Sequence, residues 1–399
     1  MRRTRVLLNW DTTRKDLLEP FISLRSDIEF IVIWRNDSGE SKVNHPFSQI
    51  YFRDFKSPYQ LLKRIKPDKI LFFNLSSFPQ IALNLAAKNL RIPTYVMHHG
   101  IHHSDSLNHS RQIEKYELNK KGNLINNVSS VLFYFSALRI KNVNQLFKYI
   151  YFAWLRQRRN ILVAMEKCVF DARLPDHYIN LSPHNAIITK IIDHVTDDDK
   201  FQYIGHPFFD NILCELNCLG EKQVNAGERY FLLIDFPNLH HLLFFKMITP
   251  EKKVELYQRL SALAKSMGCR LKIKLHPMGY KSPHNYQDDN TDLIREANMA
   301  SLIHNARECF SFVSTLLVPV IYHRKYCYIF SLGTDSQFQK ELIELGVARG
   351  LDANRFDGKE VFTQQEGKIS PSAYETFVNR YLYYTDGRAT ERLGNILLG

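Results

Sequence analysis

Residues 69–100 of the chain read KILFFNLSSFPQIALNLAAKNLRIPTYVMHHG, and this stretch decides the fold. It holds two short apolar runs, at 69–73 and 94–97, with a segment of helical spacing at 79–89 between them. Short apolar runs next to turn residues are typical of buried strands, and a strand, a helix and a second strand in this order form a parallel unit. The stretch therefore predicts an α/β domain with a mostly parallel sheet.

The alternation of strand and helix continues on both sides of this stretch. Further strands are predicted before it and in a second series, at 6–8, 30–33, 230–235, 271–275, 309–313 and 327–330. Helices of the second series are predicted at 250–267, near 291–300 and from 371 onward. We therefore expect two Rossmann-like domains, 1–220 and 221–399, joined at the polar stretch 219–229. The last helix is expected to pack back across the junction.

Length and composition exclude several classes of protein. The chain has 399 residues, of which 45% are hydrophobic, so it can bury a large core and is neither disordered nor collagen-like. Its six cysteines fit neither a disulfide framework nor a zinc pattern, which favours the reducing cytoplasm. No apolar stretch approaches the ~20 residues that span a bilayer. The net charge of +12 favours an anionic partner, such as a nucleotide phosphate, a nucleic acid or an acidic membrane surface.

Four histidines follow the predicted strand at 94–97, in the sequence HHGIHH that contains His98, His99, His102 and His103. Functional groups of parallel sheets collect at the carboxyl ends of strands, so this loop is a candidate site. Histidine is readily poised as a base near neutral pH, and Gly100 allows a ligand to approach the backbone closely. A metal site and an ordinary loop are the alternatives, although acidic or thiolate companions are not seen at ligand spacing.

A second candidate is the strand that ends in His276-Pro277. Because proline biases the preceding residue to an extended backbone, the imidazole of His276 is expected to project from the strand end. There it could donate a hydrogen bond to a phosphate oxygen, with Lys272 or Lys274 adding positive charge. The alternative is a buried structural histidine.

A third candidate is the hydroxyl pair Ser314-Thr315, which follows the predicted strand 309–313. Hydroxyl residues before a helix cap its free N–H groups, and the same N–H groups bind phosphate. Because the pair comes one strand–helix unit after His276, we expect the two to occupy neighbouring strand ends.

Five short motifs, taken in order, resemble those of a known group of enzymes. They are HHG at 98–100, GHPFFD at 205–210, KLHP at 274–277, the hydroxyl pair and DGRATERL at 386–393. The enzymes are the GT-B nucleotide-dependent transferases of bacterial surface-polymer synthesis. The chain most resembles the CDP-glycerol glycerophosphotransferases of teichoic acid synthesis and related capsular transferases, and bacterial sialyltransferases also use an HP and a Ser/Thr motif. It departs from the glycerophosphotransferases at Phe208, where they usually carry Arg, so the donor stays open.

The resemblance implies a GT-B fold, in which two Rossmann-like domains face each other across a cleft. It implies that His99 is the base toward an acceptor hydroxyl. It also implies that His276 contacts the donor phosphates and that Ser314 and Thr315 hold their phosphate end. We add Gly100, Lys274 and Pro277 as expected donor-binding residues, since they flank these motifs.

Metal-independent chemistry is expected. A GT-A enzyme would need a DxD metal site, and Asp197-Asp198-Asp199 fits that pattern formally. The three carboxylates lie in a polar stretch with no strand before it, which favours a solvated acidic loop. In the metal-free scheme, His276 and helix N–H groups meet the charge that grows on the donor phosphate.

The alternation of elements lapses between about 101 and 168, which we interpret as a basic, aromatic insertion in the first domain. Its segment 139–160 has six Lys or Arg residues and no acid, interleaved with aromatic residues. Such a segment suits docking on an anionic membrane, with Arg156, Arg158 and Arg159 on the acceptor or membrane side. The alternative is a helix whose aromatic face is buried. Nucleic-acid binding is not expected, because no recognition module accompanies the charge.

The sequence therefore predicts a metal-independent glycosyltransferase without a resident cofactor. It would move a sugar from a cytidine- or uridine-activated donor to a hydroxyl of a growing cell-surface glycan or lipid-linked acceptor. The expected place is the cytoplasm, with possible attachment to the inner face of the cell membrane. Three alternatives stay open: a CDP-glycerol-type polyol-phosphate transferase, a nucleotide-sugar 2-epimerase, and a non-catalytic membrane- or polymer-binding protein.

Overall fold

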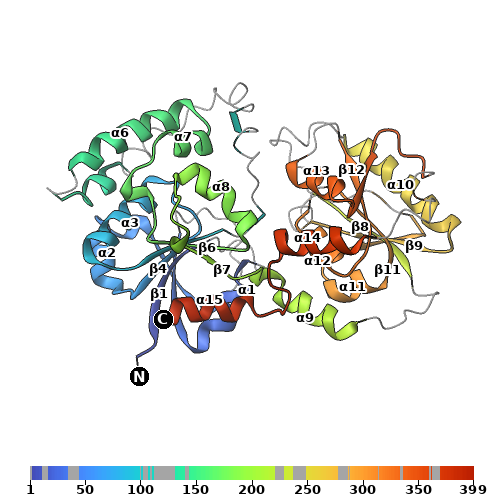
Figure 1. The fold of residues 1–399 in the computed structure, drawn as a ribbon, viewed down its shortest axis with the longest axis horizontal. Helices are drawn as coiled ribbons and strands as arrows, with labels where there is room; N and C mark the ends of the chain where they lie inside the picture. The colour runs from blue at the N-terminus through green and yellow to red at the C-terminus, as the bar shows by residue number, and fades with distance from the viewer. Residues whose placement is uncertain are drawn as a thin grey trace. The chain divides into compact units, whose positions relative to one another are not determined.

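The computed structural model describes residues 2–10, 17–34, 45–98, 100–101, 107, 110–111, 131–139, 143–220, 229–236, 249–276, 286, 288–312, 314–332, 336–358, 361 and 369–399. The chain divides into two compact units (Figure 1). Unit 1 comprises Met1–Phe208 and Arg388–Gly399, and unit 2 comprises Phe209–Gly387. The division falls before α9 (Asp210–Leu219), whereas the polar stretch 219–229 indicated a boundary after it. The reason is that α9 packs against α11 (Met299–Asn305) of unit 2.

Among the described residues, the sheet of unit 1 has seven parallel strands in the order β3-β2-β1-β4-β5-β6-β7. The strands are β1 (Thr4–Asn9), β2 (Ile28–Trp34), β3 (Ser48–Tyr51), β4 (Lys69–Phe72), β5 (Thr94–Met97), β6 (His177–Asn180) and β7 (Phe201–Tyr203). The strand order reverses between β1 and β4. In open parallel sheets, ligands bind outside the carboxyl ends of the strands at such a switch point.

The helices of unit 1 are α1 (Glu19–Ser23), α2 (Pro58–Ile65), α3 (Phe78–Leu90), α6 (Val143–Arg158), α7 (Ile161–Lys167), α8 (Pro183–Asp193) and α15 (Ala389–Leu398). Their starts follow from the sequence: Ser77 and Gln80 form a capping box at α3, and Ser182 accepts a hydrogen bond from the Asn185 N–H at α8. The helix expected at 79–89 is therefore confirmed. In the span 101–168, where the alternation of strands and helices was expected to lapse, the structure has the two helices α6 and α7.

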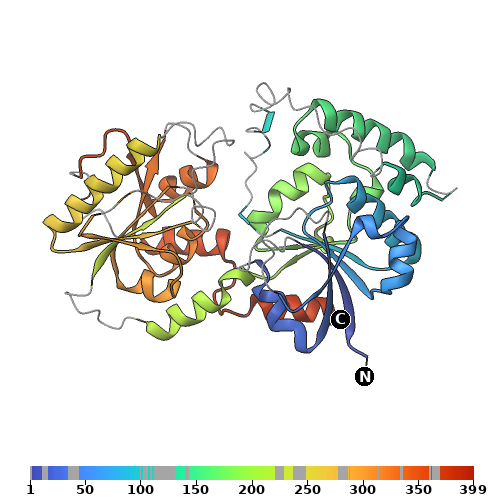
Figure 2. The same ribbon diagram turned by 180° about the vertical axis from the view of Figure 1, so that it is seen from behind.

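Helix α15 belongs to unit 1 although the whole of unit 2 precedes it in the chain. Both views show it beside α1, next to the start of the chain (Figures 1 and 2). Its Leu393 and Leu397 are buried in the apolar layer on one face of the unit 1 sheet. A Cβ at Gly394 would lie 2.7 Å from Cδ2 of Leu24, so glycine permits this close packing. The Lys69 ammonium donates to the Ile396 carbonyl at 2.9 Å.

Among the described residues, the sheet of unit 2 has six parallel strands in the order β10-β9-β8-β11-β12-β13. The strands are β8 (Tyr230–Ile234), β9 (Arg270–Lys274), β10 (Thr291–Ile294), β11 (Ala306–Ser311), β12 (Cys327–Ser331) and β13 (Ala348–Asp352). Besides α9 and α11, the helices are α10 (Pro250–Ser266), α12 (Leu317–Tyr322), α13 (Gln337–Glu344) and α14 (Pro371–Tyr381). Here the switch point lies between β8 and β11.

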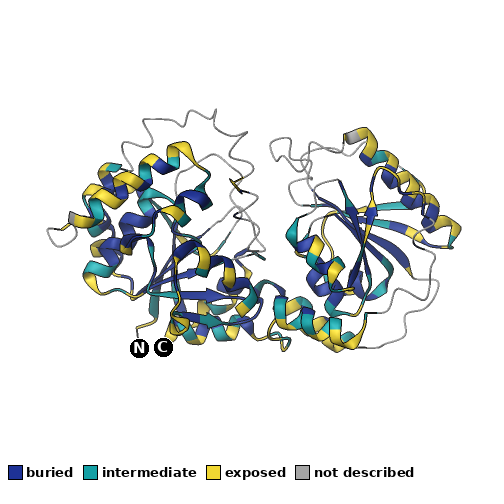
Figure 3. Ribbon diagram, turned by 45° about the horizontal axis from the view of Figure 1, so that its top comes forward, coloured by how far each residue is buried: buried dark blue, intermediate teal, exposed yellow. Residues whose placement is uncertain are grey.

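Each unit buries apolar side chains on both sides of its sheet. Figure 3 colours the buried residues of both units dark blue. The eight strands that the sequence predicts are confirmed to within a few residues, and so is the α/β class. The helix expected near 291–300 is wrong, because that stretch forms strand β10 and the start of α11. The single helix expected from 371 onward is two helices, α14 and α15.

Candidate functional site

The candidate residues of unit 2 lie at the carboxyl edge of its sheet. His276 follows β9 by two residues, and Ser314 and Thr315 follow β11 by a few residues. The expectation that these occupy neighbouring strand ends is wrong, because β8 lies between β9 and β11. The two motifs therefore flank the end of β8, beside the switch point where such sheets bind ligands.

The end of β8 carries a buried polar network that the sequence reasoning missed. The Lys253 ammonium and Asp235 Oδ1 lie 2.7 Å apart, and the Tyr257 hydroxyl donates to the same oxygen at 2.7 Å. Lys253 also donates to the Phe236 carbonyl at 2.9 Å. Burial lowers the pKa of Lys253, although Asp235 opposes the shift, and burial with the nearby Asp235 raises the pKa of Tyr257. The network fixes the backbone where β8 ends, and no local sequence pattern reports it, because the partners come from a strand and a separate helix.

The strand lysines expected to assist His276 have other partners. The Lys274 ammonium donates to the carbonyls of Leu275 at 3.0 Å and Arg295 at 2.9 Å. Lys272 lies over the ring of Tyr230, 3.9 Å from its centroid. In this structure both side chains support the strands around β9. His276 itself is half-buried, and Pro277 lies outside the described residues.

The hydroxyl pair stands just before α12. The Ser314 hydroxyl accepts a hydrogen bond from the Leu316 N–H at 3.2 Å, while Thr315 is exposed. The residue at the cap position of α12 is Leu316, whose side chain makes no capping bond. The pair thus orders the turn between β11 and α12 and leaves the Thr315 hydroxyl on the surface.

In unit 1, the HHG motif follows β5 and is tied to α8. His98 Nε2 lies 3.2 Å from the Thr189 hydroxyl, and the Asn185 amide donates to the Gly100 carbonyl at 3.1 Å. A Cβ added at Gly100 would meet no atom within 4 Å, so the backbone there is open to approach. His99 lies outside the described residues. The structure thus places the two neighbours of the expected base at the carboxyl edge of the sheet.

Asn180, at the end of β6, was also missed by sequence reasoning. Its side chain has no solvent exposure, and no described residue hydrogen-bonds to its Oδ1 or Nδ2. The parallel register pairs Met97 of β5 with Ile179 of β6. Asn180 is the next residue of β6 and therefore lies beside His98, the residue that follows β5. A buried amide without a partner costs free energy, which marks this end of β6 as unusual. A lone asparagine in a short strand gives little signal in a sequence.

The three arginines expected on the acceptor or membrane side separate in the structure. Arg156 turns inward: its guanidinium donates to the Ser76 carbonyl, just after β4, and lies over the Phe78 ring. Arg158 stacks on Trp154 with 4.7 Å between the guanidinium carbon and the ring centroid. Arg158 and Arg159 are exposed. Arg156 therefore lies near the β1–β4 switch point, and the other two point to the outer surface.

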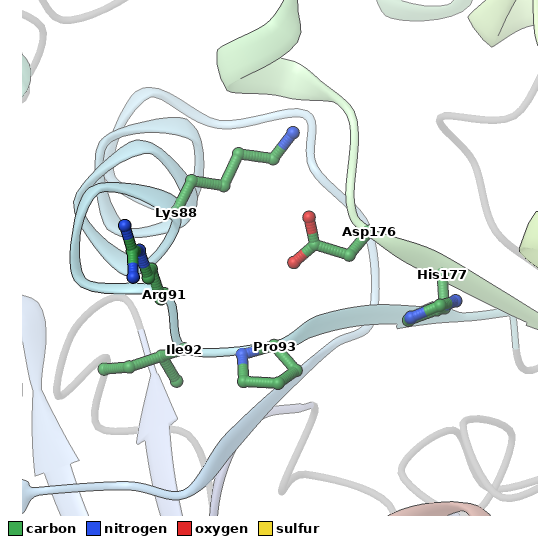
Figure 4. A pocket seen from close by; sticks show the side chains of 6 residues that line it. All are labelled: Lys88, Arg91, Ile92, Pro93, Asp176 and His177. Carbon is green, nitrogen blue, oxygen red and sulfur yellow. The ribbon is translucent and has the colours of Figure 1, made fainter.

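A cavity of about 420 Å³ opens at the opposite, amino edge of the unit 1 sheet (Figure 4). It is lined by Lys88, Arg91, Ile92, Pro93, Asp176 and His177. The Asp176 carboxylate accepts from the Thr94 N–H and hydroxyl at 2.9 Å each, and Lys88 pairs with Asp171 at 2.7 Å. Its main charged groups are thus engaged in holding β5 and α3, away from the candidate residues.

The acidic run 197–199 forms the turn before β7. Asp197 accepts from the Asp199 N–H at 3.0 Å, and Asp198 pairs with Lys190 of α8. Across the described part of the chain, no group of three His, Cys, Asp or Glu side chains is placed to hold a metal ion. The same described residues include no helix long and apolar enough to cross a membrane.

The sequence pattern of the family described as Alpha-2,8-polysialyltransferase (POLYST) matches residues 22–326 of the chain. A search of curated proteins finds no match. Among solved structures, the glycotransferase of kitacinnamycin is similar, with a TM-score of 0.56 at 13% identity over 99% of this chain and 98% of that chain.

Two further solved structures are similar over nearly the whole chain. The Methanocaldococcus jannaschii UDP-GlcNAc 2-epimerase, in complex with UDP-GlcNAc and UDP, has a TM-score of 0.51 at 13% identity, covering 99% of both chains. The wall teichoic acid polymerase TagF has a TM-score of 0.52 at 10% identity, covering 99% of this chain and 88% of that chain. At these identities the likenesses establish the fold, which is GT-B with two Rossmann-like units.

Proposed function

The chain belongs to the alpha-2,8-polysialyltransferase family, and on that premise we propose that it transfers sialic acid from a cytidine-activated donor to a growing polysialic acid chain. It is a GT-B glycosyltransferase of bacterial capsule synthesis. A cytidine donor follows from the chemistry of sialic acids, which are activated as monophosphates of that nucleoside.

One observation carries the donor site. His276 and the Ser314-Thr315 pair follow the two strands that flank β8, at the switch point of the unit 2 sheet. An imidazole, a hydroxyl group and the backbone N–H groups of a loop are the donors that suit a phosphate. We assign this edge to the phosphate of the donor, with His99 of the HHG loop on the acceptor side.

The reaction forms one bond and breaks one. The acceptor hydroxyl oxygen bonds to the anomeric carbon of the donor sugar, and its proton passes to His99. The bond between that carbon and the phosphate oxygen breaks, and the nucleoside monophosphate leaves with the electron pair. Hydrogen bonds from His276 and the hydroxyl pair stabilise the negative charge that grows on the phosphate. General-base help from a histidine contributes ~10²–10⁴-fold in rate.

A thermal-shift panel with CMP, CDP, UDP and GDP tests the donor class. A ligand that binds only the folded protein raises its unfolding temperature. At a ligand concentration of a hundred times Kd, the free energy of unfolding increases by about 2.7 kcal/mol. We expect CMP to give the largest shift. A larger shift with UDP would contradict the cytidine assignment, and no shift with any nucleotide would favour a non-catalytic binding protein.

A nucleotide-sugar 2-epimerase is the second candidate, because the fold is similar to that of the M. jannaschii enzyme. An epimerase releases a free sugar or its epimer without an acceptor, whereas a transferase needs the acceptor. Incubation of the donor with and without an oligosialic acid acceptor separates the two. Consumption of the donor that does not depend on the acceptor would favour the epimerase.

The same assay, with CDP-glycerol as the donor, tests for a CDP-glycerol-type polyol-phosphate transferase. Such an enzyme would consume CDP-glycerol and release CMP, and no sialic acid would be incorporated.

We also propose that the reaction takes place at the inner face of the cell membrane, where a lipid-linked acceptor would be held.

A further inference from the structure

Helix α6 exposes a stripe of large apolar side chains. Phe147, Ile150, Tyr151 and Trp154 are 71%, 52%, 48% and 46% exposed, at spacings of three and four residues along one side of the helix. We call these four residues the outer face of α6. Figure 3 shows exposed residues along this helix, whose label stands in Figure 1. Contiguous exposed apolar side chains of this size mark an interaction surface on a protein.

The packing of α6 does not require this stripe. The opposite side of the helix carries Tyr149, Phe152 and Leu155, which are at most 3% exposed and belong to the main apolar core of unit 1. Tyr149 stacks on Tyr134 and Phe152 packs against Phe170. The sequence left open whether the aromatic residues of this segment are buried. The structure shows two aromatic faces, one that builds the core and one that faces outward.

Positive charge borders the outer face. Lys148, Arg158 and Arg159 are exposed on the same helix and the turn after it, and residues 139–160 contain no Asp or Glu. The guanidinium of Arg158 lies over the Trp154 ring, so the charge and the aromatic ring occupy one spot on the surface. Close by, Leu132 and Phe135 are 63% and 41% exposed on the segment whose Tyr134 stacks on α6.

Resting on the proposed function and its membrane-held acceptor, we propose that the outer face of α6 docks the protein on an anionic lipid surface. Trp and Tyr side chains prefer the boundary between headgroups and acyl chains, and Arg and Lys lay apolar stems along that boundary while their charged ends meet the headgroups. An amphipathic helix with this composition lies in the plane of the interface. Helix α6 has 16 residues, about 24 Å of length, and its buried side stays packed on unit 1.

The charge selects lipid over a second copy of the chain as the occupant. Two copies of this face, whose charged residues on the described part of α6 and the turn after it are Lys and Arg, would bring like charges together, which opposes association. An anionic headgroup layer instead attracts each basic residue, strengthening binding by about fivefold per residue near a strongly anionic surface.

Flotation with lipid vesicles tests the proposal. The full chain is mixed with vesicles of phosphatidylcholine alone, or of phosphatidylcholine with phosphatidylglycerol at about three to one. We expect binding to the anionic vesicles that weakens steeply in about 0.5 M salt. Phe147→Ser combined with Trp154→Ser should weaken this binding at least about tenfold, because two aromatic side chains would no longer leave water for the lipid interface. Lys148→Glu combined with Arg158→Glu should weaken it by a similar or larger factor.

The matched control is Ile187→Ser combined with Ile191→Ser, which removes two side chains that are 41% and 40% exposed on helix α8. This variant should bind vesicles within about twofold of the wild type. Thermal unfolding of each variant checks that the fold is kept. Equal vesicle binding by the wild type and the Phe147/Trp154 variant would overturn the proposal. The proposal would also be overturned if the wild type bound no vesicles but formed a concentration-dependent dimer, and the Phe147/Trp154 variant alone disrupted that dimer.

A soluble oligosaccharide acceptor separates this proposal from the proposed function. We expect the Phe147/Trp154 variant to keep wild-type turnover on the soluble acceptor while losing the vesicles. If the wild type binds anionic vesicles but transfers no sialic acid to any acceptor, the proposed function fails and the docking surface stands. If it transfers sialic acid but never binds vesicles, the docking proposal fails alone.

Discussion

Lys253 of α10 and Asp235 at the end of β8 form a buried ion pair, with 2.7 Å between the ammonium nitrogen and the carboxylate oxygen. The two side chains are 2% and 1% exposed. Isolated charges are costly in a protein interior, so each depends on the other and on Tyr257 for its solvation. Because this pair lies where β8 ends, it fixes the backbone between the two strands that His276 and Ser314 follow.

We expect Lys253→Met to destabilise the protein by about 3–5 kcal/mol, because it leaves Asp235 buried without its counter-ion. Tyr257→Phe, which removes one hydrogen bond, should cost only about 1 kcal/mol. Adding Asp235→Leu to Lys253→Met should recover part of the loss, since no charge then stays buried. Denaturant unfolding of the three variants measures this, and a loss below about 1 kcal/mol for Lys253→Met would contradict it.

His276→Ala should weaken binding of the nucleotide that wins the thermal-shift panel by about 10- to 100-fold, the value of one charge-assisted hydrogen bond. The control is Arg270→Ala at the amino end of the same strand, where the guanidinium pairs with Asp292 at 2.7 Å. It removes a positive charge far from the carboxyl edge and should leave affinity within about twofold. Titration calorimetry compares them, and equal affinities for the two variants would exclude His276 from the phosphate site.

Asn180→Leu should raise stability by up to about 1–3 kcal/mol, because it removes a buried amide that no described residue satisfies. If the amide serves the acceptor side, turnover should fall in the same variant. Thermal unfolding and a transfer assay on one preparation give both numbers. A drop in stability would show that the amide has a structural partner, and unchanged turnover would remove Asn180 from the site.

Acid should destabilise the protein through a pair of histidines in unit 2. His304 Nδ1 and His323 Nε2 are hydrogen-bonded at 3.0 Å. Burial, together with the nearby Lys325 and His304, lowers the pKa of His323 from 6.5 to about 4. The unfolded state therefore binds more protons between these values, so stability is full above about pH 6.5 and falls as the pH drops toward 4. His323→Asn should show a smaller loss of unfolding temperature between about pH 7 and pH 5, and an equal loss would contradict the assignment.

Turnover should persist in excess EDTA, because the proposed charge stabilisation comes from His276, hydroxyl groups and backbone N–H groups. The assay compares dialysed protein with EDTA against the same protein with added Mg²⁺. A fall of about tenfold or more with EDTA that Mg²⁺ restores would require a metal in the reaction.

The sequence predicted most of the strands because buried parallel strands are runs of apolar residues. It failed at 291–300, where Thr291–Ile294 is an edge strand with only half-buried and exposed residues and so lacks that signal. β7 has only three residues, and β3 has exposed and half-buried residues, so neither shows the apolar run that marks the four-residue strands β4 and β5.

The candidate motifs were found because His276 and Ser314 directly follow recognisable strands. Their arrangement could not be read from the sequence, since strand order in a sheet is set by crossovers and β8 takes the place between them. Asp235 and Lys253 were missed for a similar reason: their pairing depends on how α10 packs on β8, which no local pattern reports.

Because α15 packs on unit 1, the core of residues 1–208 is complete only when residues 388–399 are present. During synthesis, the sheet of residues 1–208 emerges early, and the part of its apolar layer that Leu393 and Leu397 cover must stay exposed while all of unit 2 is made. That interval is a window for aggregation or chaperone capture. A chain that stops at 208 would lack the cover that α15 gives to this layer, whereas residues 209–387 include a whole compact unit and are the better choice for a separately folding fragment.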